Sequence, residues 1–171
     1  MKLTDPQAAA GADAGGLPQS DAGNPLATLP PDPGEAGLAT IAGIDSDKDG
    51  VRDDVQRFVA LTFPDSQRTE AALLQLAKSY QAWIEVPADD VDAAYAASEK
   101  NARATECLFA VTTTEKAYAA RIELKLQALN TDARQDNFFA TDKLLSGGVF
   151  ETTPDFQSGS TCEFNPQALP N

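Results

Sequence analysis

The chain has 171 residues, of which 42% are hydrophobic, so it can form one ordinary domain with a core and an additional tail. Its 26 acidic residues outnumber the 13 lysines and arginines, and the formal charge of -13 argues against nucleic acid as a partner. Histidine is absent, which excludes hydrolases of the Ser/His/Asp and Cys/His types, and no apolar run predicts a transmembrane segment.

The N-terminal part of the chain has the composition of a linker. Six of the eleven prolines and seven of the eleven glycines precede residue 44, and no aromatic residue occurs before Phe58. Such a segment cannot bury enough apolar surface to offset the entropy lost on ordering. We therefore predict a disordered Pro/Gly/Ala-rich linker over residues 1–38 and a helical domain over residues 39–171.

A twelve-residue segment, 45–56, has oxygen-bearing residues at the spacing of a metal-binding loop. Carboxylates occupy positions 1, 3, 5 and 9, Gly50 occupies position 6, a main-chain carbonyl is available at position 7, and an amide occupies position 12. Alternate residues of a tight turn can aim their side chains at one hard cation, and glycine permits the left-handed bend. The candidate ligands are Asp45, Asp47, Asp49, Val51, Asp53 and Gln56.

The stretch from Gly43 to Phe58 resembles the EF-hand-like calcium loops of the thrombospondin type 3 and dockerin class, written D-x-D-x-D-G-x-x-D. It is more closely similar to loops of uncharacterised bacterial envelope proteins and lipoproteins, in which the loop leads directly into a helix. The resemblance covers under a tenth of the chain. It implies Ca²⁺ as the bound ion, and it specifies the ion far better than the biological role.

Two positions depart from the EF-hand pattern. Gln56 stands where EF-hands have a bidentate glutamate, so we expect a dissociation constant of roughly 10⁻⁵ to 10⁻³ M. Gln56, Asp54 or water would complete the coordination. Arg52 stands where paired EF-hands have an apolar residue, and no helix is predicted before the loop, so the loop should act alone rather than as an opening sensor.

The alternative is that these acids only cap the helix that follows, with Asp53 and Asp54 complementing its N-terminal dipole. That accounts for two of the five carboxylates and leaves Asp45, Asp47 and Asp49 repelling one another without a counter-ion. We therefore predict one bound cation. Ca²⁺ is preferred to Mg²⁺, because an irregular all-oxygen loop suits six to eight ligands at longer distances.

The rest of the chain predicts an all-α fold, a small bundle of about five helices. Apolar residues recur at helical spacing over about 53–62 and 66–84, then from beyond Pro87 to 111, over 112–129 and over 132–145. The capping-box spacing of Thr112 and Glu115 separates the third helix from the fourth, with one unbroken helix as the alternative. In the fourth helix we expect a buried side formed by Ala117, Ile122, Leu126 and Leu129. Gly147 is placed as a C-cap, and an irregular tail should follow it.

The two cysteines, Cys107 and Cys162, are widely separated and lack Cys-x-x-Cys spacing, which favours one disulfide over a metal or redox site. The bridge would tie the tail to the third helix and contribute about 4 kcal/mol in the chain-entropy treatment. It would also indicate an oxidising compartment. The alternative is a cytosolic protein with two buried free thiols.

An exported protein needs a leader, and none is visible, since Met1 to Ala10 contains one lysine and no apolar stretch. We expect the natural leader to lie upstream of Met1, and a lipoprotein leader would attach a lipid anchor there. The expected location is periplasmic, outer-membrane-anchored or secreted.

These features predict a calcium-binding, non-enzymatic envelope or secreted protein. One structural Ca²⁺ would order the loop that leads into the helical domain, which would present a surface to a protein or glycan partner. The alternative is a small carboxylate-dependent hydrolase of the glycosidase type with structural calcium. That chemistry needs two carboxylates about 5 to 10 Å apart at one cleft, and the candidate acids are Glu85, Glu99, Glu106 and Glu151.

Overall fold

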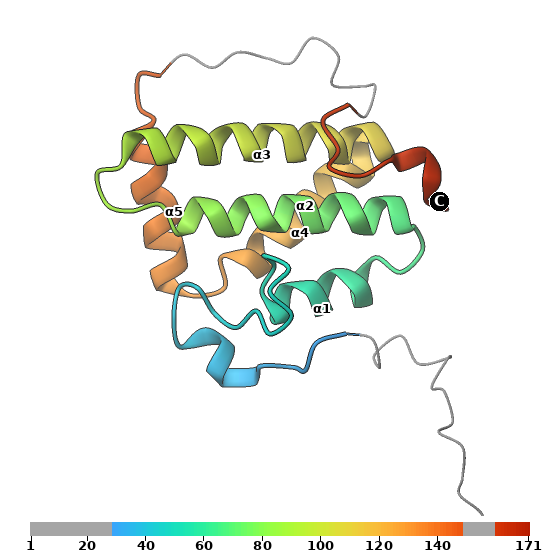
Figure 1. Cartoon of the computed structure of the whole chain (residues 1–171), viewed down its shortest axis with the longest axis horizontal. Helices are drawn as coiled ribbons and strands as arrows, with labels where there is room; N and C mark the ends of the chain where they lie inside the picture. Colours follow the sequence, from blue (N-terminus) through green and yellow to red (C-terminus); the bar gives the residue numbers. More distant parts are fainter. Residues whose placement is uncertain (1–28, 149–159) are drawn as a thin grey trace, which may run out of the picture.

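The computed structural model describes residues 29–148 and 160–171 (Figure 1). The described residues form α-helices, short 3₁₀ helices and loops, and contain no strand, which confirms the predicted all-α fold. The elements are η2 (Gly34–Leu38), α1 (Asp53–Thr62), α2 (Gln67–Ile84), α3 (Val91–Val111), α4 (Thr114–Ala128), α5 (Asp132–Leu144) and η4 (Pro166–Ala168).

Helix α2 is the centre of the bundle, because it contacts each of the other four α-helices. Figure 1 shows α3 lying alongside α2, α1 on the other side of α2, and α5 crossing one end. The core of α2 includes Leu73, Leu76, Tyr80 and Ile84, each at most 2% exposed. Spacings of three and four residues place these side chains on one broad face. At the end of α2, Trp83 stacks on Phe138 of α5 with ring centroids 5.3 Å apart.

Side-chain caps start the four longer helices, which explains why their predicted limits agree closely with the structure. Ser66 accepts a hydrogen bond from the amide of Thr69 at the start of α2. At the start of α4 the cap is Thr113, whose hydroxyl accepts from the amide of Lys116, rather than the predicted Thr112. Thr112 itself is extended, so the alternative of one unbroken helix through this point is wrong.

The predicted inner side of α4 is wrong in part. Ile122 and Leu126 were expected to be buried, but they are 61% and 70% exposed. The residues that pack against the bundle are Ala117, Ala120, Leu124 and Ala128. Both rows have helical spacing, so periodicity alone cannot distinguish them. The structure buries the row of mostly small side chains, which lets α4 approach its neighbours closely.

The folded region begins earlier than predicted. Residues 34–38 were assigned to the linker, but they form η2, and Gly37 is buried. The segment is held from a distant part of the sequence, because the side chain of Arg134 in α5 donates hydrogen bonds to the carbonyls of Gly37 and Thr40. Composition does not reveal such a partner. The remainder of the predicted linker, 1–28, lies outside the described residues.

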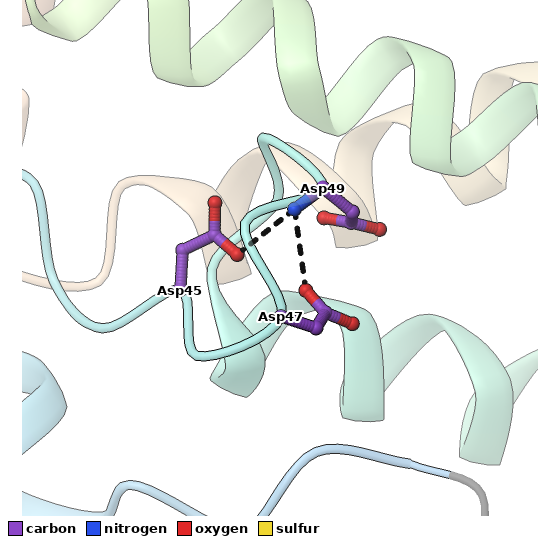
Figure 2. A group of neighbouring side chains, drawn as sticks. All are labelled: Asp45, Asp47 and Asp49. Carbon is purple, nitrogen blue, oxygen red and sulfur yellow. Dashed lines mark hydrogen bonds between the residues drawn. The ribbon is translucent and has the colours of Figure 1, made fainter.

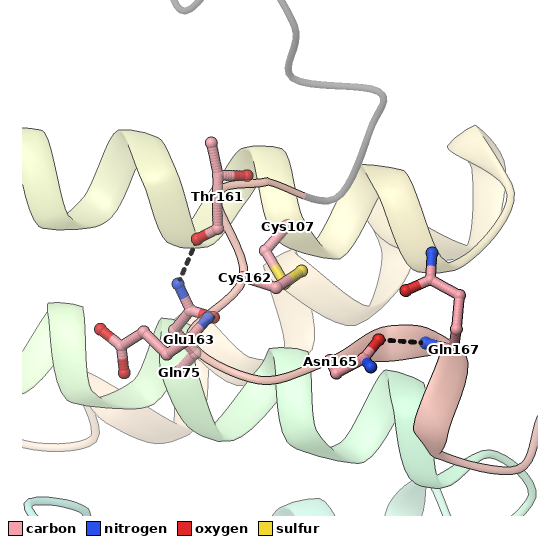
Figure 3. The surroundings of a disulfide bond; sticks show 7 residues. All are labelled: Gln75, Cys107, Thr161, Cys162, Glu163, Asn165 and Gln167. Carbon is pink, nitrogen blue, oxygen red and sulfur yellow. Dashed lines mark hydrogen bonds between the residues drawn. A yellow bond between two sulfur atoms is a disulfide. The ribbon is translucent and has the colours of Figure 1, made fainter.

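The predicted disulfide between Cys107 and Cys162 is present, with an S–S distance of 1.98 Å (Figure 3). It fastens residues 160–171 to α3. Gln75 of α2 adds two bonds on either side of Cys162, since its Nε2 donates to the carbonyl of Thr161 at 3.0 Å and its Oε1 accepts from the amide of Glu163 at 3.0 Å. Farther on, Arg68 donates to the carbonyl of Leu169 at 2.7 Å. The described part of the predicted irregular tail is thus bound along α2 and includes η4, while 149–159 lies outside the described residues.

Within the described ranges, none of the helices combines the length and the apolarity needed to cross a membrane. The disulfide indicates an oxidising, extracytoplasmic environment.

Candidate metal centre in the loop before helix α1

The candidate loop connects η2 to α1, and its backbone turns sharply at two positions. Gly50 has φ of +89° and Lys48 has φ of +59°, both in the left-handed region. Gly50 reaches that region without cost because it lacks a Cβ, and the prediction assigned it this role. Lys48 adopts it despite its side chain, which indicates that the surrounding turn imposes the conformation.

Three carboxylates of the loop lie together (Figure 2). Each of Asp45, Asp47 and Asp49 places one oxygen within 4.8 Å of the oxygens of the other two. The amide of Asp49 donates to Asp45 Oδ1 at 3.2 Å and to Asp47 Oδ1 at 3.3 Å, and the amide of Gly50 donates to Asp45 Oδ2 at 3.0 Å. These main-chain donors hold the carboxylates on the inner side of the turn. In the part of the chain that the structure describes, no other three acidic residues group this closely.

The electrostatics of the loop favour a cation. Partial burial raises the pKa of Asp49, and the neighbouring charges of Asp47 and Asp45 raise it further. The amide of Val51, which donates to Asp49 Oδ1 at 2.7 Å, and the ammonium of Lys78 act in the opposite direction, but the net shift is upward. Like charges at this separation repel one another, and a bound cation would relieve that repulsion.

Two of the predicted ligands, Val51 and Asp53, are each 1% exposed but lie outside the group of three carboxylates. The side chain of Val51 belongs to the core, which is compatible with its predicted role because only its carbonyl would bind a cation. Asp53 Oδ1 accepts from the amide of Ser46 at 2.9 Å, while the amide of Asp53 donates to the carbonyl of Ile44 at 2.8 Å. Asp53 therefore closes the loop by joining its two ends.

The structure places Gln56, rather than Asp54, beside the acidic group. Gln56 Nε2 donates to Asp47 Oδ2 at 3.3 Å, and Gln56 Oε1 is buried without a hydrogen-bond donor among the described residues. Asp54 instead accepts from Arg52 Nε at 2.9 Å and from Asn130 Nδ2 at 3.0 Å. Of the two side chains that could complete the coordination, Gln56 is the one with the suitable position and a free acceptor.

Arg52 has a role that the sequence did not reveal. Its side chain is 2% exposed and forms the ion pair with Asp54. It also donates to the carbonyl of Ala128 at 3.0 Å and to that of Gln127 at 3.2 Å, at the end of α4. Carbonyls at the end of a helix lack intrahelical donors and carry partial negative charge, so they suit a buried guanidinium. The only sequence signal is an arginine in an acidic loop with an aspartate two residues later.

The environment of Asp54 keeps its carboxylate charged. Burial alone would raise its pKa, but hydrogen bonding and charge from Arg52, a hydrogen bond from Asn130 and the charge of Arg134 together lower it. Arg52 and Asp54 therefore form a stable, largely buried pair that anchors the loop to α4.

Of the acids proposed for a hydrolase, those within the described residues do not converge on either of two cavities in the surface. Glu85 lines a cavity of about 510 Å³ beside the loop, together with Asp45 and Lys78. A second cavity, of about 570 Å³, lies among the ends of α1, α2, α3 and α4, and its lining among the described residues does not include Glu85, Glu99 or Glu106. Glu99 and Glu106 lie on α3, and Glu151 is outside the described residues.

Comparisons of the chain with protein-family models, curated proteins and solved structures found no significant match. The class that the fold and the site define is a helical, disulfide-linked protein with three neighbouring aspartates that could hold a metal ion.

Proposed function

We propose that residues 45–56 bind one Ca²⁺ and that the protein is a non-enzymatic interaction module of the cell envelope or of the secreted fraction. The observation that carries the proposal is the group formed by Asp45, Asp47 and Asp49, whose carboxylate oxygens lie within 4.8 Å of one another on a loop with calcium-loop spacing. The cation would enter among these oxygens and offset their mutual repulsion.

The donor set favours Ca²⁺ over other ions. All candidate ligand atoms are oxygens. Structural zinc sites use nitrogen and sulfur ligands, so the donor set does not suit zinc. Three carboxylates, the Val51 carbonyl and the Gln56 amide offer enough oxygens for a flexible site, with Asp53 or water filling further positions. The unpaired Gln56 Oε1 supports its inclusion, because rotation of the amide would place this oxygen beside Asp47 Oδ2.

The proposed role of the ion is structural. The twelve-residue loop runs into α1, which begins at Asp53, and Val51 and Val55 are both part of the core. Ordering the loop therefore fixes where α1 begins and how it packs. At a calcium concentration 100 times the dissociation constant, binding would add about 2.7 kcal/mol to the free energy of unfolding.

Support for an interaction module comes from the outer side of α4. Tyr118, Ile122 and Leu126 follow one another at four-residue spacing and are 54%, 61% and 70% exposed. A row of large exposed apolar side chains is typical of a surface that binds a partner. A protein partner would cover this row, whereas a glycan would engage mainly Tyr118. The alternative hydrolase lacks comparable support, since the described candidate acids do not gather at one cavity.

The disulfide and the resemblance of the loop to those of envelope proteins support a periplasmic, outer-membrane-anchored or secreted location. A lipid anchor attached upstream of the sequence is part of the same proposal.

Calorimetric titration of chelator-treated protein, with a melt recorded with and without Ca²⁺, tests the proposed function. We expect one ion per chain with a dissociation constant of roughly 10⁻⁵ to 10⁻³ M, and a melting temperature that rises by roughly 5–10 °C at saturation. Asp47→Asn should weaken binding at least about tenfold, because it removes a ligand charge.

Asp92→Asn is the matched control, since it makes the same change in charge at an exposed acid of α3. It should bind Ca²⁺ as the unaltered protein does. Absence of both heat and a thermal shift in the unaltered protein would show that the acids only order the turn before α1.

A further inference from the structure

The loop lacks the entering helix that an EF-hand uses to position its first ligand, so something else must hold the chain that leads to Asp45. The residues before the loop form η2 and then an irregular stretch up to Ile44. Two arginines distant from each other in sequence, Arg52 and Arg134, meet at this stretch. We call them the arginine clamp.

Arg134 binds the main chain ahead of the loop at several points. Its side chain is fully buried, and its guanidinium donates to the carbonyls of Gly37 at 2.7 Å, Thr40 at 2.9 Å and Ile41 at 3.1 Å. One side chain of α5 thus supplies hydrogen-bond donors to three main-chain carbonyls of the segment that leads to the loop.

The two arginines share a partner. Asn130, in the turn between α4 and α5, accepts from both Arg134 and Arg52 through its Oδ1 and donates from its Nδ2 to Asp54. Asp54 in turn pairs with Arg52. The clamp is therefore one connected network, joining α5 to the loop and to the start of α1.

Gly43 shows how tightly the clamp closes on the chain. Its φ is +67°, and a Cβ built on it would lie 2.3 Å from Arg52 Cδ and 2.9 Å from Arg134 Nη2. The backbone passes between the two side chains, where only glycine fits. Asp45, the first residue of the acidic group, follows two positions later.

We propose that Arg134 is a positioning residue for the calcium loop, and that calcium binding is linked through the arginine clamp to the docking of residues 34–44. The inference rests on the proposed calcium site. Arg134 touches no candidate ligand; it acts by fixing the backbone that presents Asp45. Ca²⁺ in turn fixes Asp45 and so favours the docked segment, because coupling between two sites is reciprocal.

The first arm of the test compares calcium affinities of the unaltered protein, Arg134→Gln and Arg134→Lys. We expect Arg134→Gln to weaken Ca²⁺ binding by about tenfold, within the usual range for coupled sites. Arg134→Lys keeps a buried cation that can still donate to carbonyls, and it should recover part of the loss. Arg57→Gln is the matched control, since the hydrogen bond of Arg57 within the described residues goes to the carbonyl of Pro30, which precedes the segment 34–44. This variant should leave the affinity unchanged.

Gly43→Ala keeps both arginines, so it tests the linkage if Arg134→Gln does not fold. Its Cβ would push the two guanidinium-bearing side chains apart, so the expected loss of calcium affinity is of the same order as for Arg134→Gln.

Hydrogen exchange distinguishes a positioning role of Arg134 from a purely structural one. The quantity measured is the effect of Ca²⁺ on amide exchange over residues 34–44. In the unaltered protein, Ca²⁺ should slow exchange at amides of residues 34–44 as well as in the loop. In Arg134→Gln this effect should disappear from 34–44 while it persists within 45–56. The linkage would be overturned if Arg134→Gln and Gly43→Ala both fold and bind Ca²⁺ with the affinity of the unaltered protein. It would also be overturned if Ca²⁺ slowed exchange over 34–44 in both variants as much as in the unaltered protein. Either result would leave the proposed calcium site intact. Failure of the unaltered protein to bind Ca²⁺ would overturn the proposed function together with this inference.

Discussion

The acidic loop depends on the positive charge of Arg52, which pairs with Asp54 and is not a candidate metal ligand. The side chain of Arg52 is 2% exposed and that of Asp54 is 14% exposed, so each carries a charge that water scarcely reaches. Removal of one partner leaves the other charge buried without its counter-ion, which costs far more than the pair contributes as a net interaction.

The Asp54–Arg52 pair predicts a pH-dependent stability. Asp54→Asn should lower the free energy of unfolding by about 2–4 kcal/mol at pH 7, measured by urea denaturation without calcium. The folded-state pKa of Asp54 lies below the ordinary 3.8, so its contribution is complete above that pH and is lost as the pH falls through the lowered value. The two proteins should therefore converge in stability in strong acid. A difference that stays constant from neutral pH to strong acid would contradict this assignment.

The contrast between Gln56 and Asp54 shows what local spacing can and cannot predict. Spacing selected Asp45, Asp47 and Asp49, because residues that alternate in a tight turn are brought together by the turn itself. It could not distinguish Gln56 from Asp54 as the candidate for an additional ligand. That choice depends on Arg52 and Asn130, which engage Asp54 from other parts of the fold.

At the scale of the elements, α4 presents two apolar rows on opposite sides. The buried row includes Leu124, which is fully buried, and the outer row includes Ile122, which is 61% exposed. Both are large aliphatic residues on the same helix, so they form a matched pair for measuring what burial contributes.

Leu124→Ala should destabilise the protein by about 2–5 kcal/mol, because it leaves a cavity in the core. Ile122→Gln should change the free energy of unfolding by no more than about 0.5 kcal/mol, as expected for an exposed site. Urea denaturation of the two variants measures both effects. If the two substitutions lowered the free energy of unfolding by comparable amounts, the outer row of α4 that includes Ile122 would be buried rather than exposed.

The helix limits were predictable because caps are local. Ser66, the predicted first residue of the second helix, is the residue that caps it. Gly147 has the left-handed φ expected of it, but the C-cap of α5 is Leu145, two residues before the predicted position. The orientation of α4 and the early start of the folded region were not predictable in this way. Each depends on contacts with distant residues, such as that of Arg134 with Gly37, and single-sequence patterns carry no record of such pairs.

At the scale of the whole molecule, one covalent link and several side-chain bonds bind the C-terminal segment. The Cys107→Ala, Cys162→Ala double variant should lose about 4 kcal/mol of stability, since the cross-link restricts the unfolded chain. Hydrogen exchange should rise most in 160–171, where Gln75 and Arg68 would then provide the remaining attachment. The calcium affinity proposed for the loop at 45–56 should not change, because the loop lies outside this region. Loss of calcium binding in a folded double variant would contradict that separation.

The disulfide also makes part of the backbone a covalent ring. Helices α4 and α5 lie between Cys107 and Cys162 in the chain, so the ring includes both of them. A single peptide-bond cleavage anywhere between the two cysteines opens the ring without releasing a fragment. Nicked and intact chains would therefore have nearly equal mass until a reductant is added, and only then would two pieces separate. Electrophoresis without a reductant would therefore not distinguish cleaved chains from intact ones.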